Sequence, residues 1–422
     1  MMAVIGDHAC SSESMTSTTS IDANTQPIWE YVSIAGYEVP STPVRQTVKQ
    51  RLAILHHILG RVDSPAEDPL KKTDELKALP EQMLDLVAPL PNWLSAAEAL
   101  DLKLADWLEQ EKSHPCIILL VGPPYGGHTE ILRAWAEQKA WPTLNPPSPE
   151  QILAGDDAWL AGLGNTGGSW VFPNLERAYL RHAAGLNQVR TFLDRAYAGD
   201  LGRGIIGCDS WAWAFLQHVW HGRLPIVWAL EAFDQTRLTH HFQHLAVTAD
   251  GRQPVFCQSD TGHYVLPPPD ADQKTYESSS FLQLLAAHSR GILGVAWAVW
   301  RASLRKEQEG KQAAEALAEN HIDPRRTIWV TPWDQLNKPV VPGDVRHDEA
   351  VVLHTLLLHS GLSLELMRQL LPMSLNRIAE TVARLQEAGI VAQDGATWRV
   401  APLGYPPARQ FLQEVGYLTD QF

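Results

Sequence analysis

The chain has few cysteines, no long apolar run and no excess of basic side chains, and each absence removes a class of protein. Its four cysteines lie far apart without CxxC spacing, so we expect neither a disulfide framework nor a zinc knuckle. A reducing cytoplasm fits this cysteine usage best. No apolar run reaches the roughly 18 residues of a membrane span, and the N-terminus lacks the basic and apolar segments of a secretory signal. Direct membrane insertion is therefore not expected.

The net charge of −14 argues against a general attraction for nucleic acid, which requires a basic surface. It does not exclude a local DNA site. Hydrophobic residues make up 45% of the chain and charged residues 19%, the balance of a soluble globular protein with a large core. Because 422 residues are too many for one ordinary core, we expect two or three domains.

What the sequence does contain is a strand, a glycine-rich loop and a helix in direct succession, in the stretch PCIILLVGPPYGGHTEILRAWAEQ at 115–138. The apolar run at 117–121 predicts a buried strand, and a helix is expected to begin near His128. This order is the context that a phosphate-binding P-loop requires.

The P-loop pattern GxxxxGK[ST] is met at Gly122, Gly127 and Thr129, whereas His128 stands at the lysine position. Backbone N–H groups of such a loop converge on an anion, helped by the positive end of the helix. An unperturbed imidazole is mostly neutral at pH 7, so His128 would not replace the lysine charge. We therefore predict a nucleotide cradle with weak or absent hydrolysis. An ordinary tight turn whose glycines serve packing is the alternative.

The residues predicted to contact ATP or ADP lie in this loop and the first turn of its helix. They are Gly122, Pro123, Tyr125, Gly126, Gly127, His128, Thr129 and Glu130. The hydroxyl of Thr129 would bind a Mg²⁺ ion that accompanies the nucleotide.

Downstream of the loop, apolar strands alternate with helical patterns, as a parallel sheet with crossover helices requires. A weak strand is predicted at 140–144 and a helix at 148–163. Further strands are expected near 168–173 and 224–234, and 202–216 is expected to hold another strand followed by its helix. Five strands with the loop after the first predict a three-layer α/β nucleotide-binding domain.

From 97 to 421 the chain resembles the AAA+ and STAND-type P-loop ATPases in the order of its motifs. That order is a P-loop, a Walker B-like strand end, a polar strand tip, a helical lid and a winged helix. In WVFPNLERAYLRH, Pro173 stands where the family has its magnesium-directing aspartate, with Asn174 beside it and Glu176 slightly later. The resemblance thus implies degenerate Walker motifs.

The same resemblance assigns further roles. The CDSW strand end is similar to the sensor 1 tip, where Asp209 or Ser210 would face the outer phosphate. The segment HSRGILGVAWAVWR is similar to the lid helix break that carries a sensor 2 arginine, and Arg290 is the matching position. Glu176 and Asp209 are the catalytic candidates, and Arg181 is the candidate arginine finger.

Each assignment has a structural alternative. Glu176 could be a solvated carboxylate favoured by a helix dipole. Asp209 could be the N-cap of the following helix. Gly291 after Arg290 could simply cap a helix, and arginines such as Arg181 more often form surface pairs.

Residues 346–402 are predicted to form three helices and a two-stranded wing whose tip is AQDGAT, and this resembles a winged helix. The helix at 374–388 would be the one that reads DNA. Between 346 and 399, however, five arginines face six acidic residues, a net charge of −1. A structural or protein-binding role is therefore favoured over DNA binding.

The predicted organisation starts with a mostly disordered segment at 1–43 and a helical region at 44–93. An α/β P-loop domain at 94–234 follows, then a helical lid at 235–320 with an inserted loop at 248–280, and a winged-helix domain at 327–422. We expect nucleotide bound between the α/β domain and the lid to control a protein partner or self-association. The alternatives are an active ATPase that uses His128 and Glu176, and a scaffold or DNA-binding regulator that binds no nucleotide.

Overall fold

The computed structural model describes most of the chain from Pro27 onward. The described residues are 27–41, 70–71, 75–110, 116–164, 168–222, 225–247, 251–268, 276–307, 326–343 and 346–422. Much of the predicted disordered segment 1–43 and of the predicted helical region 44–93 lies outside them.

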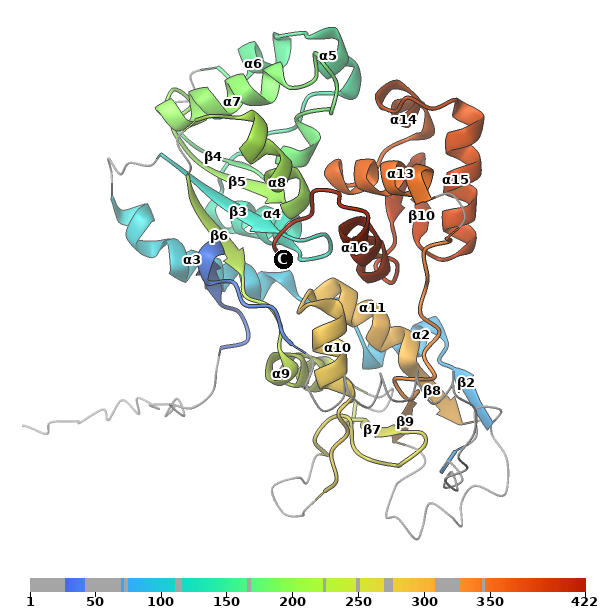
Figure 1. The fold of residues 1–422 in the computed structure, drawn as a ribbon. Helices are drawn as coiled ribbons and strands as arrows, with labels where there is room; N and C mark the ends of the chain where they lie inside the picture. The colour runs from blue at the N-terminus through green and yellow to red at the C-terminus, as the bar shows by residue number, and fades with distance from the viewer. Residues whose placement is uncertain are drawn as a thin grey trace, which may run out of the picture.

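A five-stranded sheet forms the centre of the α/β domain (Figure 1). Strand β3 (Ile117–Gly122) lies between β6 (Ile226–Leu230) and β5 (Arg203–Asp209), and β4 (Ser169–Phe172) follows β5. These four strands are parallel. Strand β1 (Tyr31–Ser33) adds an antiparallel edge to β6. It lies inside the segment that was predicted to be mostly disordered.

Helices cover both faces of this sheet because alternate residues of β3 point to opposite sides. Ile118 and Leu120 pack with α3 (Trp93–Glu109) and α4 (His128–Lys139). Ile117, Leu119 and Val121 pack with α7 (Asn187–Ala198) and α8 (Ser210–Val219) on the other side. The predicted three-layer α/β architecture with a parallel sheet is confirmed.

Two predicted elements of this domain differ in detail. The strand expected at 140–144 is reduced to a single parallel bridge between Thr143 and Val171. The helix expected at 148–163 is divided into α5 (Pro149–Ala154) and α6 (Ala158–Gly162), because Gly155 adopts a left-handed φ of 66° and ends α5.

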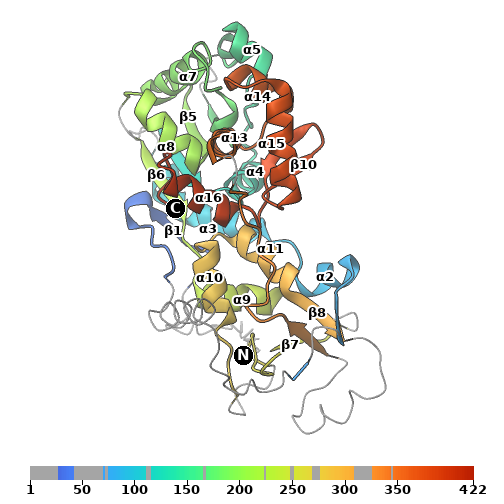
Figure 2. The same ribbon diagram turned by 45° about the vertical axis from the view of Figure 1, so that its right-hand side comes forward.

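A second, smaller sheet has the strand order β2-β8-β9-β7, and lies at the far end of the molecule from α5–α7 (Figures 1 and 2). Its strands are β2 (Leu76–Ala78), β7 (Val255–Gln258), β8 (Leu304–Glu307) and β9 (Thr327–Val330). Helices α2 (Glu81–Val87), α9 (Gln235–Leu245), α10 (Phe281–Ser289) and α11 (Leu293–Ser303) share its core.

This sheet corrects the predicted helical lid at 235–320 and the helical region at 44–93. Beyond Ser303 the chain enters strand β8, and β7 lies within the segment 248–280 that was expected to be an inserted loop. Strand β2 likewise interrupts the region that was expected to be helical, because it pairs with β8. Pairing between distant segments decided these elements rather than local pattern.

The C-terminal unit (residues 346–422) contains the predicted order of three helices and a hairpin. The helices are α13 (Arg346–Leu358), α14 (Leu364–Leu370) and α15 (Leu375–Glu387), and the hairpin is β10 (Val391–Asp394) with β11 (Thr397–Val400). Gly395 forms the hairpin tip with a φ of 59°. A further helix, α16 (Tyr405–Glu414), packs on α13.

The C-terminal unit is docked on the α/β domain and on α11 through one shared apolar cluster. This cluster joins Trp211 of α8 and Val295 of α11 to the core of the C-terminal unit. The Trp211 indole donates a hydrogen bond of 3.1 Å to the Tyr405 hydroxyl. The docked arrangement is therefore held by buried contacts rather than by surface pairs.

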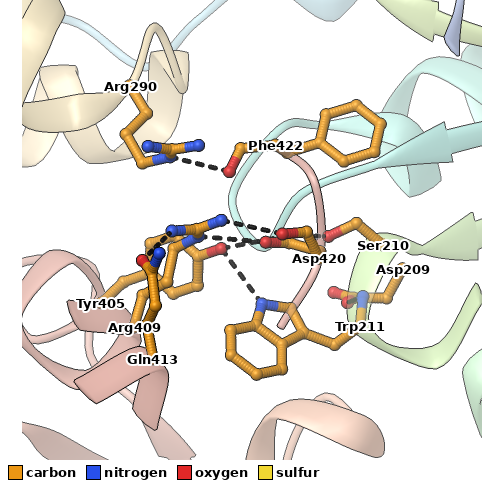
Figure 3. A network of polar contacts seen from close by, with 9 residues as sticks. All are labelled: Asp209, Ser210, Trp211, Arg290, Tyr405, Arg409, Gln413, Asp420 and Phe422. Atoms are coloured by element: carbon orange, nitrogen blue, oxygen red, sulfur yellow. Dashed lines mark hydrogen bonds and ion pairs between the residues drawn. The ribbon is translucent and has the colours of Figure 1, made fainter. Parts of the chain in front are cut away.

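The chain after α16 adds a polar network to this interface (Figure 3). The Asp420 carboxylate accepts from Arg409 Nε at 3.0 Å and from the Ser210 hydroxyl. Arg290, at the end of α10, donates to the main-chain oxygen of Phe422 at 2.7 Å. Residues 420–422 therefore connect α8, α10 and α16.

Asp420→Ala should destabilise the protein by about 3–5 kcal/mol, because it leaves the Arg409 guanidinium buried without its partner. The side chains of this pair are 8% and 1% exposed. Urea unfolding followed by tryptophan fluorescence measures the change. Glu365→Ala is the matched control, since Glu365 pairs with Arg368 at an exposed site. Equal midpoints for the two variants would contradict the assigned role of Asp420.

Candidate functional site

The turn between β3 and α4 is shaped by Gly126 and Gly127. Gly127 is the N-cap of α4 with a φ of 81°, and a Cβ atom there would lie 2.3 Å from the Trp93 ring. Only glycine fits this position. The Gly126 N–H closes the turn on the Pro123 carbonyl at 2.8 Å.

The amides that follow are not used internally. Among the described residues, no acceptor is found for the N–H groups of Gly127, His128 and Thr129. They lie at the positive end of α4, where unpaired donors and the helix dipole favour a bound anion. The loop has therefore not collapsed on itself.

His128 occupies the loop as a neutral side chain. Its imidazole is 8% exposed and lies against Gly122, where a Cβ atom would be 2.9 Å from Nδ1. Neither ring nitrogen has a hydrogen-bond partner among the described residues. Burial lowers the pKa of His128 to about 4. The positive charge of a P-loop lysine is therefore missing, and two buried ring nitrogens are left without a hydrogen-bond partner.

The floor of the site is a chain of hydrogen bonds across three strand ends. Asn174 Nδ2 donates to Thr129 Oγ1 at 3.0 Å and approaches Glu176 Oε1 at 3.5 Å. Glu176 Oε2 accepts from the Asp209 N–H at 3.1 Å. These residues meet because the carboxyl ends of parallel strands lie at one edge of the sheet.

Both carboxylates on this floor are buried. Glu176 is 2% exposed, so the reading of it as a solvated carboxylate is wrong, and burial raises its pKa to about 6. Burial and the nearby Glu176 charge raise the pKa of Asp209 well above its usual value. Asp209 also caps α8 by accepting from the Trp211 N–H at 2.9 Å, as the structural alternative predicted.

A cavity of about 400 Å³ lies over this floor, within the range of ligand pockets. Its walls come from two parts of the chain. The α/β domain contributes Pro124, Tyr125, Gly127, His128, Thr129, Glu130, Arg133, Asn174, Glu176, Arg177 and Asp209. The C-terminal unit contributes Leu356, Leu357, Ser360, Gly361, Arg399 and Val400.

Four polar residues of this cavity were not predicted. Arg133 is one helical turn beyond Thr129, so helical spacing could have indicated it. Arg177 directly follows Glu176 and lacked a signal of its own. Ser360, whose hydroxyl donates to Asp209 Oδ2 at 3.3 Å, and Arg399 reach the site only through docking of the C-terminal unit.

The remaining predicted loop residues lie on the other side of the turn. Gly122, Pro123 and Gly126 line a second cavity with Phe233 and Ile292. Its volume is about 20 Å³, room for a water molecule and no more. In this conformation the apolar side of the loop is therefore closed.

Two predicted arginines line neither cavity. Arg290 has a φ of 56° at the C-cap of α10, and its guanidinium binds Phe422, so the structure does not bring it to the loop. The helix-cap alternative accounts for Arg290 and Gly291. Arg181 is exposed, and its N–H faces His359 Nε2 at 3.4 Å. A contact of Arg181 with a neighbouring copy stays a prediction.

The unpaired loop amides suit nucleotide phosphates, whereas the position that follows β4 does not suit Mg²⁺. The Thr129 hydroxyl is already engaged by Asn174 Nδ2 at 3.0 Å and approaches the Pro173 carbonyl at 3.5 Å. Pro173 offers no carboxylate at the metal-directing position, whereas Mg²⁺ usually binds through one or two carboxylates. Among the described residues, no group of three or more His, Cys, Asp or Glu could hold a metal ion.

No helix in the described part of the chain has the length and apolar character needed to cross a bilayer.

Comparison with known proteins gives distant structural similarities only. No family model and no curated protein matches the chain. A Signal Transduction ATPase with Numerous Domains and a tetratricopeptide repeat sensor, from Pyrococcus horikoshii, is similar at a TM-score of 0.29 and 10% identity, over 85% of this chain. This chain spans 45% of the length of that protein.

Two further structures show the same level of similarity. The Walker-type ATPase of Pyrococcus abyssi has a TM-score of 0.25 at 12% identity, over 76% of this chain and 96% of its own. A mutant of Thermotoga maritima RuvB has a TM-score of 0.27 at 13% identity, over 79% and 98%. With scores this low, these similarities do not define a family for the chain.

Acid should destabilise the protein in part through His128. The folded pKa of about 4 lies below the usual 6.5, so the unfolded chain binds more protons between these values. The stabilising contribution is complete above pH 6.5 and is lost as pH falls toward 4. Between pH 7 and pH 5 the loss is about 2 kcal/mol.

His128→Gln should remove this part of the pH dependence. Urea unfolding at pH 7 and pH 5 measures it, with the exposed His221→Gln as the control. If both variants lose as much stability as the wild type on acidification, His128 is not buried as described.

Proposed function

We propose that this protein binds the phosphates of ATP or ADP on the 122–129 loop, and that the bound nucleotide controls the docking of the C-terminal unit. The main support is that unpaired loop amides and the unpartnered His128 imidazole line a cavity closed by the C-terminal unit. A ligand that touches both walls favours the docked state, by reciprocal linkage. Docking would in turn control a protein partner or self-association in the cytoplasm.

The base of the nucleotide would enter on the apolar side of the loop. The small cavity there is lined by Tyr37, Phe233 and Ile292, and it must widen to hold an aromatic ring. Widening would move α11 relative to the loop. In the proposal, nucleotide binding thus acts on α11 and on the C-terminal unit packed against it.

DNA binding by α15 is less well supported. Arg377 pairs with Asp348 at 2.8 Å and Arg384 pairs with Glu349 at 3.2 Å, so both arginines of the helix are engaged within the unit. A reading helix needs its basic side chains directed to phosphates and bases.

Calorimetric titration tests the proposal. ADP, ATP and pyrophosphate should bind, and adenosine should bind far more weakly, because the loop offers amide donors for phosphate. Chelation of Mg²⁺ should change the ADP affinity by less than about threefold, since the metal-directing carboxylate is missing. His128→Lys should tighten pyrophosphate binding roughly tenfold by restoring a cation. An absence of binding for all four ligands would refute the proposal.

Slow ATP hydrolysis is a second candidate, favoured by one observation. Burial raises the pKa of Glu176 to about 6, and Glu176 lines the cavity of about 400 Å³ together with Thr129 and Asn174. A carboxylate with a pKa near the working pH is suited to act as a general base.

If hydrolysis occurs, its rate should rise with pH through about 6, as Glu176 loses its proton. Steady-state phosphate release measures this, and Glu176→Gln should abolish it. Glu98→Gln, an exposed change on α3, is the control. Release that persists in Glu176→Gln would exclude Glu176 as the base.

A further inference from the structure

The floor of the 400 Å³ cavity over the loop, here called the phosphate cavity, provides no positive charge for a bound phosphate. His128 is neutral, and the two groups beneath the loop, Glu176 and Asp209, are acids. A diphosphate placed over them would meet negative charge whenever either acid is ionised. Phosphate sites in proteins are normally completed by a guanidinium or an ammonium group.

Three arginines line the same cavity and come from three elements. Arg133 lies on α4, Arg177 ends the 3-10 turn Leu175–Arg177, and Arg399 lies on β11. Arg399 is the one that the C-terminal unit contributes. It therefore adds its charge only when that unit is docked.

Strand β11 and a hydrogen bond between the loop and this strand together position Arg399. Trp398 and Val400 are buried, so the alternation of β11 leaves the Arg399 side chain exposed, and Arg399 lines the cavity. The Tyr125 hydroxyl of the loop donates to the Val400 carbonyl, which fixes the hairpin over the loop. Burial raises the pKa of Tyr125, and the Arg399 charge opposes that rise, as expected for neighbouring groups.

The present partner of Arg399 is replaceable. Its guanidinium pairs with Asp394 of β10, and the two side chains are 46% and 66% exposed. Such exposed pairs contribute little stability. A phosphate, which accepts two parallel hydrogen bonds from a guanidinium, can therefore take the place of Asp394.

We propose that Arg399 is a nucleotide-binding residue that supplies, from the C-terminal hairpin, the cation that the 122–129 loop lacks. Its ligand is the diphosphate group of ADP or the corresponding part of ATP. This inference rests on the proposed function and makes it more specific. The phosphate site is complete only in the docked state, so the phosphates themselves hold the C-terminal unit in place.

Titration of full-length variants with inorganic pyrophosphate and with ADP tests the inference. Arg399→Ala should weaken both ligands by roughly tenfold or more, because a charge-assisted bidentate contact is lost. The affinities of Arg399→Lys should lie between those of Arg399→Ala and the wild type, because lysine keeps the positive charge but lacks the two parallel hydrogen-bond donors of a guanidinium. Asp394→Ala should tighten pyrophosphate by roughly twofold to fivefold, because it removes the competing partner.

Arg368→Ala is the matched control. Arg368 lies on α14 of the same unit, is 52% exposed and pairs with Glu365, and its removal should leave both affinities unchanged. Urea unfolding midpoints of Arg399→Ala and Arg368→Ala should equal that of the wild type. Hydrogen exchange gives a second readout: ADP should slow exchange across 346–422 in the wild type and in Arg368→Ala, but not in Arg399→Ala.

The outcomes separate the two proposals. If the wild type binds pyrophosphate and Arg399→Ala binds it equally well, the role of Arg399 is overturned while nucleotide binding stands. Equal weakening in Arg399→Ala and Arg368→Ala also overturns it, because the effect is then one of net charge. If the wild type binds neither ligand, nucleotide binding and the role of Arg399 fail together.

Discussion

The buried docking of the C-terminal unit on the α/β domain is the constraint on which the site depends. Trp211 and Val295 pack into the core of that unit, and Ser210, Arg290 and Arg409 hold the segment 420–422 between them. Because these contacts are buried, loss of any one leaves unpaired groups or a cavity. The cavity over the loop exists because this interface brings Ser360 and Arg399 opposite Thr129.

Within that cavity, burial sets the charges more than residue type does. A histidine and two carboxylates that would be charged or partly charged in water are shifted toward their neutral forms. On the α/β side, the attraction for an anion therefore comes from the loop amides together with Arg133 and Arg177, which line the same cavity. Because His128 adds no positive charge, a further cation from outside the loop would strengthen the attraction for a bound anion.

The cavities on the two sides of the loop also differ in size and in polarity. The side facing the larger cavity is roomy and polar, whereas the side lined by Tyr37 and Ile292 is apolar and almost filled. A nucleotide that bridges both sides has to displace packed groups near α11. One of these groups, Ile292, also belongs to the apolar cluster shared with the C-terminal unit. If a nucleotide binds as proposed, its entry and the docking of the C-terminal unit would therefore be coupled.

Local pattern predicted some elements well and others poorly. The strand at 117–121 and the helix from His128 were predictable because an apolar run and a glycine turn are adjacent in sequence. Strands β2 and β8 were missed because each is held by pairing with a distant segment rather than by its own pattern. Arg290 was predicted to face the nucleotide, but the structure places it against Phe422 for a related reason. The helix break was visible in the sequence, but the partner that it faces, Phe422, is 132 residues away.

The sequence by itself determined the glycine turn, its missing lysine and the four parallel strands around it, because contiguous residues specify backbone shape and hydrophobic period. Only the tertiary structure decided that Glu176 and His128 are buried and that Arg399 borders the cavity over the loop. Burial and charge proximity depend on which distant segments meet, and that information lies in packing rather than in spacing along the chain.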